Sequence, residues 1–242
     1  MRLLMVLTSH GRLGNTGKKT GVWLEEFAAP YYVFADEDVD IDFASPKGRE
    51  PPIDPRSEEP GAQTTATKRF RVDASAQYLF TNTLKLSTIS PRDYDAVFYP
   101  GGHGPLWDLA EDQHSIALIE ALLAEGKMIG AVCHGPAAFR HARTPGGEHI
   151  VKNKSVTGFS SAEEEAVGIV DVVPFLVEDM LKQKGGRYSK AGNWQPHAVV
   201  DGALVTGQNP ASSTGTAWLL LDKLLGNILT EDERAKASGV AA

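Results

Sequence analysis

The chain has 242 residues, of which 42% are hydrophobic, and these values suit one large water-soluble domain. Its formal charge of -7 at pH 7, with no basic run interleaved with aromatic residues, argues against nucleic-acid binding. The single cysteine excludes an internal disulfide and a multi-cysteine zinc site, and it is compatible with a reducing compartment. The apolar run at residues 3–7 is too short for a signal-peptide core, and no run approaches the ~20 residues that span a membrane. We therefore expect a cytoplasmic protein with no membrane contact.

Buried strands alternate with helices in the first half of the chain. Short apolar or alternating runs predict strands at residues 2–8, 39–45, 95–99 and 128–133. Helical spacing begins at Thr20, and further helices are expected over residues 72–84 and 106–125. A polar loop is expected over residues 9–19, and a proline-rich stretch over residues 46–67 predicts a surface loop or insertion rather than a separate domain.

The second half continues the alternation with shorter elements. We expect a helix directly after Cys133, a strand pair within 150–158, a helix over 172–185, strands at 187–191 and 198–206, and a last helix that ends at Leu225. From about Thr230 the chain is expected to be a loose polar tail. The pattern predicts one α/β domain over residues 1–229 and a tail over 230–242. Its sheet is expected to be doubly wound, flavodoxin-like and mostly parallel, with helices on both faces.

The most informative stretch is the passage from the strand at 128–133 into the next helix. Cys133 ends the apolar run, and His134, Gly135 and Pro136 suit a tight turn with proline in the first helical turn. Helix N–H groups and the helix dipole favour a thiolate, so we expect Cys133 to ionise more readily than a free cysteine. The alternative is a small buried hydrophobic residue without a chemical role. The residues alone leave both interpretations open.

A carboxylate on the apolar side of the first helix is the second candidate. Glu26 falls on the same side as Val22 and Trp23. It either reaches solvent at the helix edge, or it is buried near a reactive group, where loss of solvation raises its pKa and lets it carry a proton near neutral pH.

A glycine cluster follows the strand at 95–99. Gly101, Gly102, His103 and Gly104 fit neither a P-loop nor a dinucleotide-binding fingerprint. The cluster is either an ordinary tight turn or an oxyanion hole. We favour the oxyanion hole, because this loop and the Cys133 turn would share one edge of a parallel sheet.

The acidic run at residues 163–165 and the histidines each allow a structural or a functional interpretation. The acidic run at residues 163–165 is interpreted as the solvated first turn of a helix, in which one of the three glutamates can still point inward. His103, His134 and Cys133 lie at no familiar metal-ligand spacing, so we predict neither a metal nor a cofactor. The remaining histidines are interpreted as surface or structural residues: His10, His114, His141, His149 and His197.

At these residues the chain resembles the DJ-1/PfpI superfamily of the class I glutamine amidotransferase-like fold, and in particular its Hsp31-like, glyoxalase III group. The resemblance covers most of the chain and rests on five stretches in the same order: Thr20-Gly21-Val22 with Glu26, Gly102-His103-Gly104, the elbow at 131–137, residues 155–159 with Glu164, and residues 201–212. The region 46–67 departs from the fungal members. No His-x-Glu pair stands near the C-terminus, which disfavours glutamine hydrolysis.

The resemblance implies a role for each candidate residue. Cys133 corresponds to the nucleophile, His134 to the triad histidine, Glu26 to the acid that touches the sulfur, and Glu164 to the acid that orients the histidine. Oxyanion or substrate contacts are implied for Gly102, His103 and His134. The implied activity is the glutathione-independent conversion of methylglyoxal and water to lactate, with a related deglycase-type removal of aldehydes. A homodimer is also implied.

Two other functions remain open at this stage. One is a stress-response holdase chaperone whose cysteine senses oxidation. The other is hydrolysis of a different small electrophile by the same cysteine.

Overall fold

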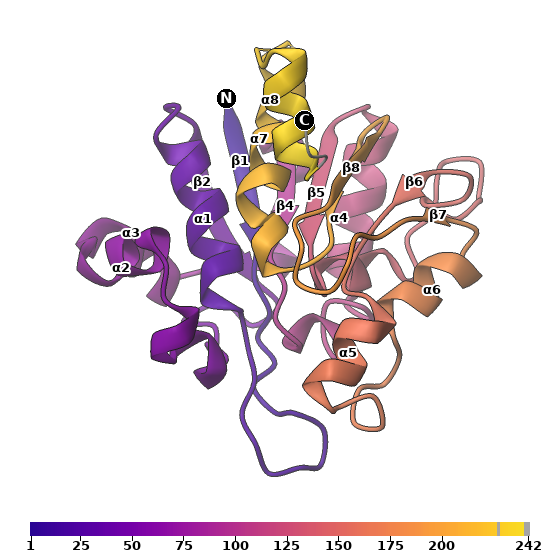
Figure 1. Cartoon of the computed structure of the whole chain (residues 1–242). Helices are drawn as coiled ribbons and strands as arrows, with labels where there is room; N and C mark the ends of the chain where they lie inside the picture. Colours follow the sequence, from indigo (N-terminus) through magenta and orange to yellow (C-terminus); the bar gives the residue numbers. More distant parts are fainter. Residues whose placement is uncertain (227, 240–242) are drawn as a thin grey trace.

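A parallel sheet forms the centre of the molecule (Figure 1). The computed structural model describes residues 1–226 and 228–239. Seven strands stand in the order β3-β2-β1-β4-β5-β9-β8, and only the β8–β9 pair is antiparallel. The strands of this sheet are β1 (Arg2–Val6), β2 (Asp40–Ser45), β3 (Leu84–Lys85), β4 (Ala96–Tyr99), β5 (Met128–Val132), β8 (Ala198–Asp201) and β9 (Leu204–Gly207). The predicted fold class, a mostly parallel doubly wound α/β sheet, is confirmed.

Helices cover both faces of this sheet. The helices are α1 (Leu24–Ala35), α2 (Thr65–Val72), α3 (Ala74–Thr81), α4 (Gln113–Ala124), α5 (Ser161–Val167), α6 (Val177–Gln183), α7 (Ser213–Leu224) and α8 (Glu231–Ser238). In β1, Leu3 and Met5 belong to one core cluster and Leu4 and Val6 to the other, because successive strand side chains point to opposite faces. The first cluster holds residues of α1 and α7, and the second holds residues of α4 and α6. Both faces being buried explains why the strands read as continuous apolar runs.

The first helix begins later than predicted. Residues 20–23 are extended because Val22 pairs with Ile53 in a parallel bridge, and the Val22 N–H donates to the Pro52 carbonyl over 2.8 Å. The helix therefore starts at Leu24. The stretch 46–67 is correspondingly more than a surface loop, since Asp54 and Ser57 are fully buried. It packs against the segment before α1, through the Val22–Ile53 bridge and the hydrogen bond from Thr20 to Asp54.

Several later elements are shorter than predicted. The helix after Cys133 is a five-residue 3-10 helix, η6 (Gly135–Phe139), and the helix predicted over 106–125 begins only at Gln113. No strand pair forms within residues 150–158. Instead β6 (Ser155–Val156) pairs in parallel with β7 (Arg187–Tyr188) as a separate two-stranded sheet. The predicted helix over 172–185 is α6, which begins five residues later.

The region expected to be a loose tail contains a helix. Thr230 caps α8, and Arg234 of α8 donates to Asp222 of α7 over 2.7 Å. Asp222 is fully buried, so this pair joins α8 to the body of the molecule. Residues 240–242 of the predicted tail lie outside the described residues. The single-domain organisation over residues 1–229 stays a prediction.

No helix in the described part of the chain combines the length and apolar character that a bilayer-spanning segment requires.

Candidate active site

The carboxyl ends of β4 and β5 bring the predicted residues together. β4 is followed by Gly101, Gly102 and His103, and β5 is followed by Cys133 and His134. The two strands are adjacent and parallel, so both loops leave the same edge of the sheet. Glu26 enters from the first turn of α1, and Glu164 enters from the first turn of α5.

Cys133 occupies a sharp elbow between β5 and η6. Its φ of 59° is in the left-handed region, which is unfavourable for a residue with a side chain. Its N–H donates to the Gly207 carbonyl over 2.9 Å, and its carbonyl accepts from the Phe159 N–H over 2.8 Å. Neighbouring segments thus hold the elbow on both sides, and this stabilises the conformation that places Sγ at the sheet edge.

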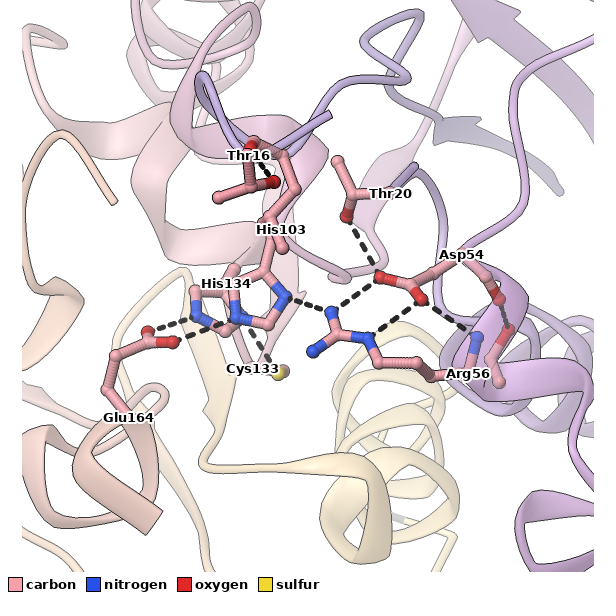
Figure 2. Close-up of polar contacts among 10 residues, drawn as sticks. Thr16, Thr20, Asp54, Arg56, His103, Cys133, His134 and Glu164 are labelled. Carbon is pink, nitrogen blue, oxygen red and sulfur yellow. Dashed lines mark hydrogen bonds and ion pairs between the residues drawn. The ribbon is translucent and has the colours of Figure 1, made fainter. Parts of the chain in front are cut away.

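A hydrogen-bonded triad begins at the thiol. Cys133 Sγ lies 3.2 Å from Nδ1 of His134, and Nε2 of the same ring donates to Oε2 of Glu164 over 2.7 Å (Figure 2). All three side chains are buried. Because the Nε2 proton is held by the carboxylate, Nδ1 is the atom free to take a proton from the thiol.

His103 supports the same carboxylate from the other side. Its Nε2 lies 2.8 Å from Oε1 of Glu164, and its Nδ1 lies 3.0 Å from Nη2 of Arg56. Since a guanidinium can only donate, Nδ1 of His103 accepts and the ring proton resides on Nε2. Burial and the adjacent His134 ring lower the pKa of His103 to about 4, which agrees with a neutral ring. Both ring nitrogens are engaged, so the predicted substrate contact by the His103 side chain is not favoured by this geometry.

Glu164 is the acid that receives both histidines. Burial alone would raise the pKa of Glu164, but its contacts with His134 and His103 lower that pKa well below its ordinary value. Glu163 is also buried and accepts from Ser160 and from Asn209, so it closes a capping box and ties down a neighbouring loop. Two of the three glutamates point inward, where the sequence had suggested one; Glu165 is exposed.

Glu26 lies beside the sulfur in a closed environment. It is fully buried, and neither carboxyl oxygen has a hydrogen-bond partner of good geometry among the described residues. Burial raises the pKa of Glu26 to about 8, although the Cys133 thiol and the Gly101 N–H lie close enough to oppose the rise. The carboxyl group can therefore hold or release a proton near neutral pH, as one of the two sequence interpretations proposed.

The thiol itself differs from the sequence expectation. Burial, with the nearby carboxyl groups of Glu26, Glu163 and Glu164, raises the pKa of Cys133 well above its ordinary value. The expected thiolate relied on the dipole of a full helix, but η6 has only five residues of 3-10 helix. This direction favours the thiol form of Cys133, so attack on an electrophile would require transfer of its proton to a neighbour.

The glycine loop packs tightly against this group. A Cβ at Gly101 would lie 2.4 Å from a carboxyl oxygen of Glu26, and Gly102 has a φ of +88° and no room beside the Gly21 carbonyl. The Gly101 and Gly102 N–H groups face the Glu26 carboxyl group. Among the described residues the backbone N–H of His134 donates to no protein acceptor. Of these three groups, the His134 N–H is therefore the one available to an oxyanion on a carbon bonded to Sγ.

Two aromatic rings enclose the histidine side of the site. The Phe159 ring centroid lies 4.4 Å from that of His134 and 5.8 Å from that of Trp194. Phe159 is buried, while Trp194 is half exposed. The stack excludes water from one side of the triad, which strengthens its electrostatic contacts.

Sequence reasoning missed a second polar chain that meets the triad. Arg56 donates to Asp54 through Nε over 3.0 Å and through Nη2 over 2.7 Å, and Asp54 also accepts from the Thr20 hydroxyl over 2.9 Å. Arg56 lies in the 46–67 stretch, 47 residues before His103. The only local signal was an Asp-Pro pair that marks a short helix start. That signal gives no indication of a contact with the triad.

One group of described residues has the composition of a metal site. The ligand atoms of His103, His134 and Glu164 lie within 4.8 Å of one another. Their facing atoms are already paired, because both Nε2–H groups donate to the Glu164 carboxylate, and the Arg56 guanidinium lies against His103. A cation would have to displace two ring protons beside a positive charge, so this donor set suits a triad better than a metal.

Replacing Glu164 with glutamine is expected to slow alkylation of Cys133 by iodoacetamide about tenfold or more. The glutamine side chain has only one acceptor, its carbonyl oxygen, and its NH2 group would face the Nε2–H group of one histidine. Because two donors cannot pair, that histidine would have to carry its proton on Nδ1 instead. For His134 this blocks proton transfer from the thiol. The exposed neighbour Glu165 supplies the control variant Glu165→Gln. Equal alkylation rates in the two variants would remove Glu164 from the triad.

Comparisons with known proteins identify the family to which this chain belongs. The model of the DJ-1/PfpI family matches residues 19–222. A glutathione-independent glyoxalase of Saccharomyces cerevisiae is 31% identical, covering 92% of this chain and 98% of the relative. The crystal structure of glyoxalase III from Candida albicans is 31% identical, with a TM-score of 0.86 over 91% of this chain and 96% of that one. The structure of the Francisella tularensis Rapid Encystment Protein 24 KDa is 38% identical, with a TM-score of 0.88 over 92% of this chain and 98% of that one. The resemblance inferred from the sequence is confirmed, and the chain belongs to the DJ-1/PfpI family.

Proposed function

We propose that this protein is a glutathione-independent glyoxalase that converts methylglyoxal and water to lactate. The observation that carries the proposal is Glu26, a buried carboxyl group with a pKa of about 8 beside the Cys133 thiol. Simple hydrolysis needs only a nucleophile and its histidine, whereas this reaction also moves a proton between two carbon atoms. The relatives named glyoxalase, from Candida albicans and Saccharomyces cerevisiae, support the same conclusion.

The first step joins the thiol to the aldehyde. Sγ of Cys133 bonds to the aldehyde carbon, the carbonyl electron pair moves to oxygen, and the thiol proton passes to Nδ1 of His134, 3.2 Å away. The N–H group of His134, which has no acceptor among the described residues, stabilises the oxyanion. The product of this step is the alkoxide of a hemithioacetal, with Glu164 holding the protonated His134 in place.

The second step transfers a proton within the bound substrate. Glu26, in its ionised form, takes the proton from the former aldehyde carbon and returns it to the adjacent carbon through an enediol. The alkoxide on the first carbon thereby becomes a thioester carbonyl, and the oxygen on the second carbon takes the proton from His134 to become an alcohol, so one carbon is oxidised and the other reduced. A pKa near 8 gives Glu26 both the base form and the acid form in the neutral range.

The third step releases the product. Water adds to the thioester carbon with His134 as the base, the bond to Sγ breaks, and the thiol recovers its proton as lactate leaves. Over the cycle one methylglyoxal and one water give one lactate, and no external oxidant or cofactor is consumed.

The alternative of an oxidation sensor is less well supported by this site. A sensor cysteine is exposed and ionises readily, whereas Cys133 is 3% exposed and has a raised pKa. Deglycase-type aldehyde removal would use the same three steps. A homodimer and a cytoplasmic location are further parts of the proposal that rest on resemblance to the Hsp31-like group. Size-exclusion chromatography with light scattering tests the dimer.

The decisive experiment is a lactate assay on purified protein without glutathione. We expect one lactate for each methylglyoxal consumed, with no increase when glutathione is added. Consumption of methylglyoxal without lactate would indicate stoichiometric thiol trapping instead. No consumption by folded protein with a reduced cysteine would overturn the proposal.

A further inference from the structure

Arg56 has donors that the protein itself does not use. Nε and Nη2 donate to Asp54, and Nη2 also donates to Nδ1 of His103. Among the described residues Nη1 has no hydrogen-bond partner. A guanidinium has five N–H groups, so the two on Nη1 are available to a ligand.

The spare nitrogen faces the reactive thiol. Figure 2 shows the Arg56 guanidinium beside His103, with the nitrogen that carries no dashed line on the side toward Cys133. Arg56 lies within electrostatic range of both Cys133 and Glu164, which agrees with this position. A cavity of about 560 Å³ opens on Arg56 and is also lined by Trp23 and Pro210. Arg56 thus stands between the triad and an open space large enough for a small substrate.

The guanidinium is held rigidly before any ligand arrives. Asp54 is fully buried and receives Arg56 in a two-point pair, while Thr20 and the Arg56 N–H occupy the remaining positions on its oxygens. The pair largely balances the positive charge. A donor in this state suits a neutral carbonyl or hydroxyl oxygen that becomes negative during the reaction, because its hydrogen bond forms on binding and strengthens further in the transition state.

We propose that Nη1 of Arg56 binds the oxygen on the carbon next to the aldehyde, and that it thereby selects α-oxoaldehydes over simple aldehydes. This inference rests on the proposed function. In methylglyoxal the second carbonyl oxygen becomes the enediol oxygen when Glu26 moves the proton. Arg56 stabilises the charge that develops there, while Cys133 and the backbone N–H groups act on the first carbon. A simple aldehyde forms the same hemithioacetal but offers Arg56 no oxygen.

The test compares Arg56→Gln with wild type for three properties. We expect kcat/KM for methylglyoxal to fall about 100-fold, through both KM and kcat, because one donor to the substrate oxygen and to the oxyanion that develops there is lost. Protection of Cys133 from iodoacetamide by propanal, which forms only the hemithioacetal, should change less than twofold. The pH profile of alkylation should also be unchanged. Arg56→Lys, which keeps a charge and a donor, should recover part of the turnover.

Two outcomes overturn the inference. Unchanged turnover in Arg56→Gln would remove Arg56 from the reaction. Loss of propanal protection together with a shifted alkylation profile would mean that Arg56 acts only by positioning His103. Thermal unfolding checks that the variants are folded, and Arg71→Gln, an exposed arginine paired with Glu58, is the matched control.

A binding comparison separates this inference from the proposed function. Glycolaldehyde carries an oxygen on the carbon next to the aldehyde, and propanal does not. Wild type should be protected by glycolaldehyde at about tenfold lower concentration, and Arg56→Gln should show no such preference. A wild-type protein that keeps this preference but forms no lactate would refute the glyoxalase and retain the role of Arg56. Equal protection by both aldehydes would refute the role of Arg56, whatever the turnover.

Discussion

Cys133→Ala is expected to lower lactate formation by about 10,000-fold or more, a loss of about 5 kcal/mol in transition-state stabilisation. The sulfur forms the bond to the substrate, and no other described side chain of the site can replace it: His134, His103 and Arg56 are paired in one network, and Glu26 is a weaker nucleophile. The remaining oxyanion donors still bind the aldehyde. Binding without turnover is therefore the expected phenotype.

The fold should survive this substitution. Alanine removes one buried sulfur atom and keeps the Cβ, so we expect a stability loss of about 1 to 2 kcal/mol. The backbone contacts of the elbow to Gly207 and Phe159 do not involve the side chain. Circular dichroism and thermal unfolding of the variant provide the control. Lactate formation above a hundredth of the wild-type rate in a folded Cys133→Ala protein would place the nucleophile elsewhere.

Glu26→Gln is expected to lower turnover by about 100 to 10,000-fold and to raise stability at the same time. Glutamine has nearly the same shape but cannot take a proton from carbon, so the internal transfer stops while hemithioacetal formation continues. The loss should be less complete than in Cys133→Ala. Iodoacetamide protection by propanal should persist in Glu26→Gln, which keeps the thiol that forms the hemithioacetal.

The gain in stability follows from the pKa of Glu26. An unfolded glutamate has a pKa of 4.5, and in the folded protein burial raises it to about 8. Between these values the folded state keeps a proton that the unfolded state has released. Wild-type stability is therefore fully present below about pH 4.5 and falls by about 1.4 kcal/mol per pH unit up to about pH 8. Glutamine lacks this proton equilibrium.

Urea unfolding at several pH values between 5 and 8 measures this effect. The free energies of unfolding of wild type and Glu26→Gln should diverge as the pH rises, with the variant more stable at pH 8. The exposed Glu165→Gln variant should follow wild type throughout. Parallel curves for wild type and Glu26→Gln would show that Glu26 is ionised in the folded protein at neutral pH.

Local patterns were sufficient for the centre of the site. The apolar run before Cys133 predicts β5, and the glycine and proline after it predict the turn, because both depend on neighbouring residues only. Glu26 was selected by helical spacing from Val22 and Trp23; its burial is confirmed, but the spacing argument was wrong, because both of those residues precede α1. For Glu164, the residues alone did not decide among three glutamates, and the choice came from resemblance. The Ser160-x-x-Glu163 capping box could have assigned Glu163 a structural role.

What the sequence did not reveal depends on contacts between distant segments. Arg56 and Asp54 meet His103 and Thr20 only after the sheet has formed, and their stretch has no periodicity. The late start of α1 has the same origin, because Val22 is held extended by Ile53. The raised pKa of Cys133 arises from three carboxyl groups on two other elements. Burial and charge at a site are sums over the whole fold, and a local pattern contains only part of them.

The bridge between Val22 and Ile53 has a consequence for how this protein can acquire new substrates. It attaches the stretch with Asp54 and Arg56 to the segment before α1, and not to β5 or the elbow. Reactivity and selectivity therefore belong to different parts of the chain. Mutations within residues 46–67 can change which aldehyde is accepted while the thiol chemistry is preserved. A library randomised in this stretch alone is accordingly a compact starting point for directed evolution toward other carbonyl compounds.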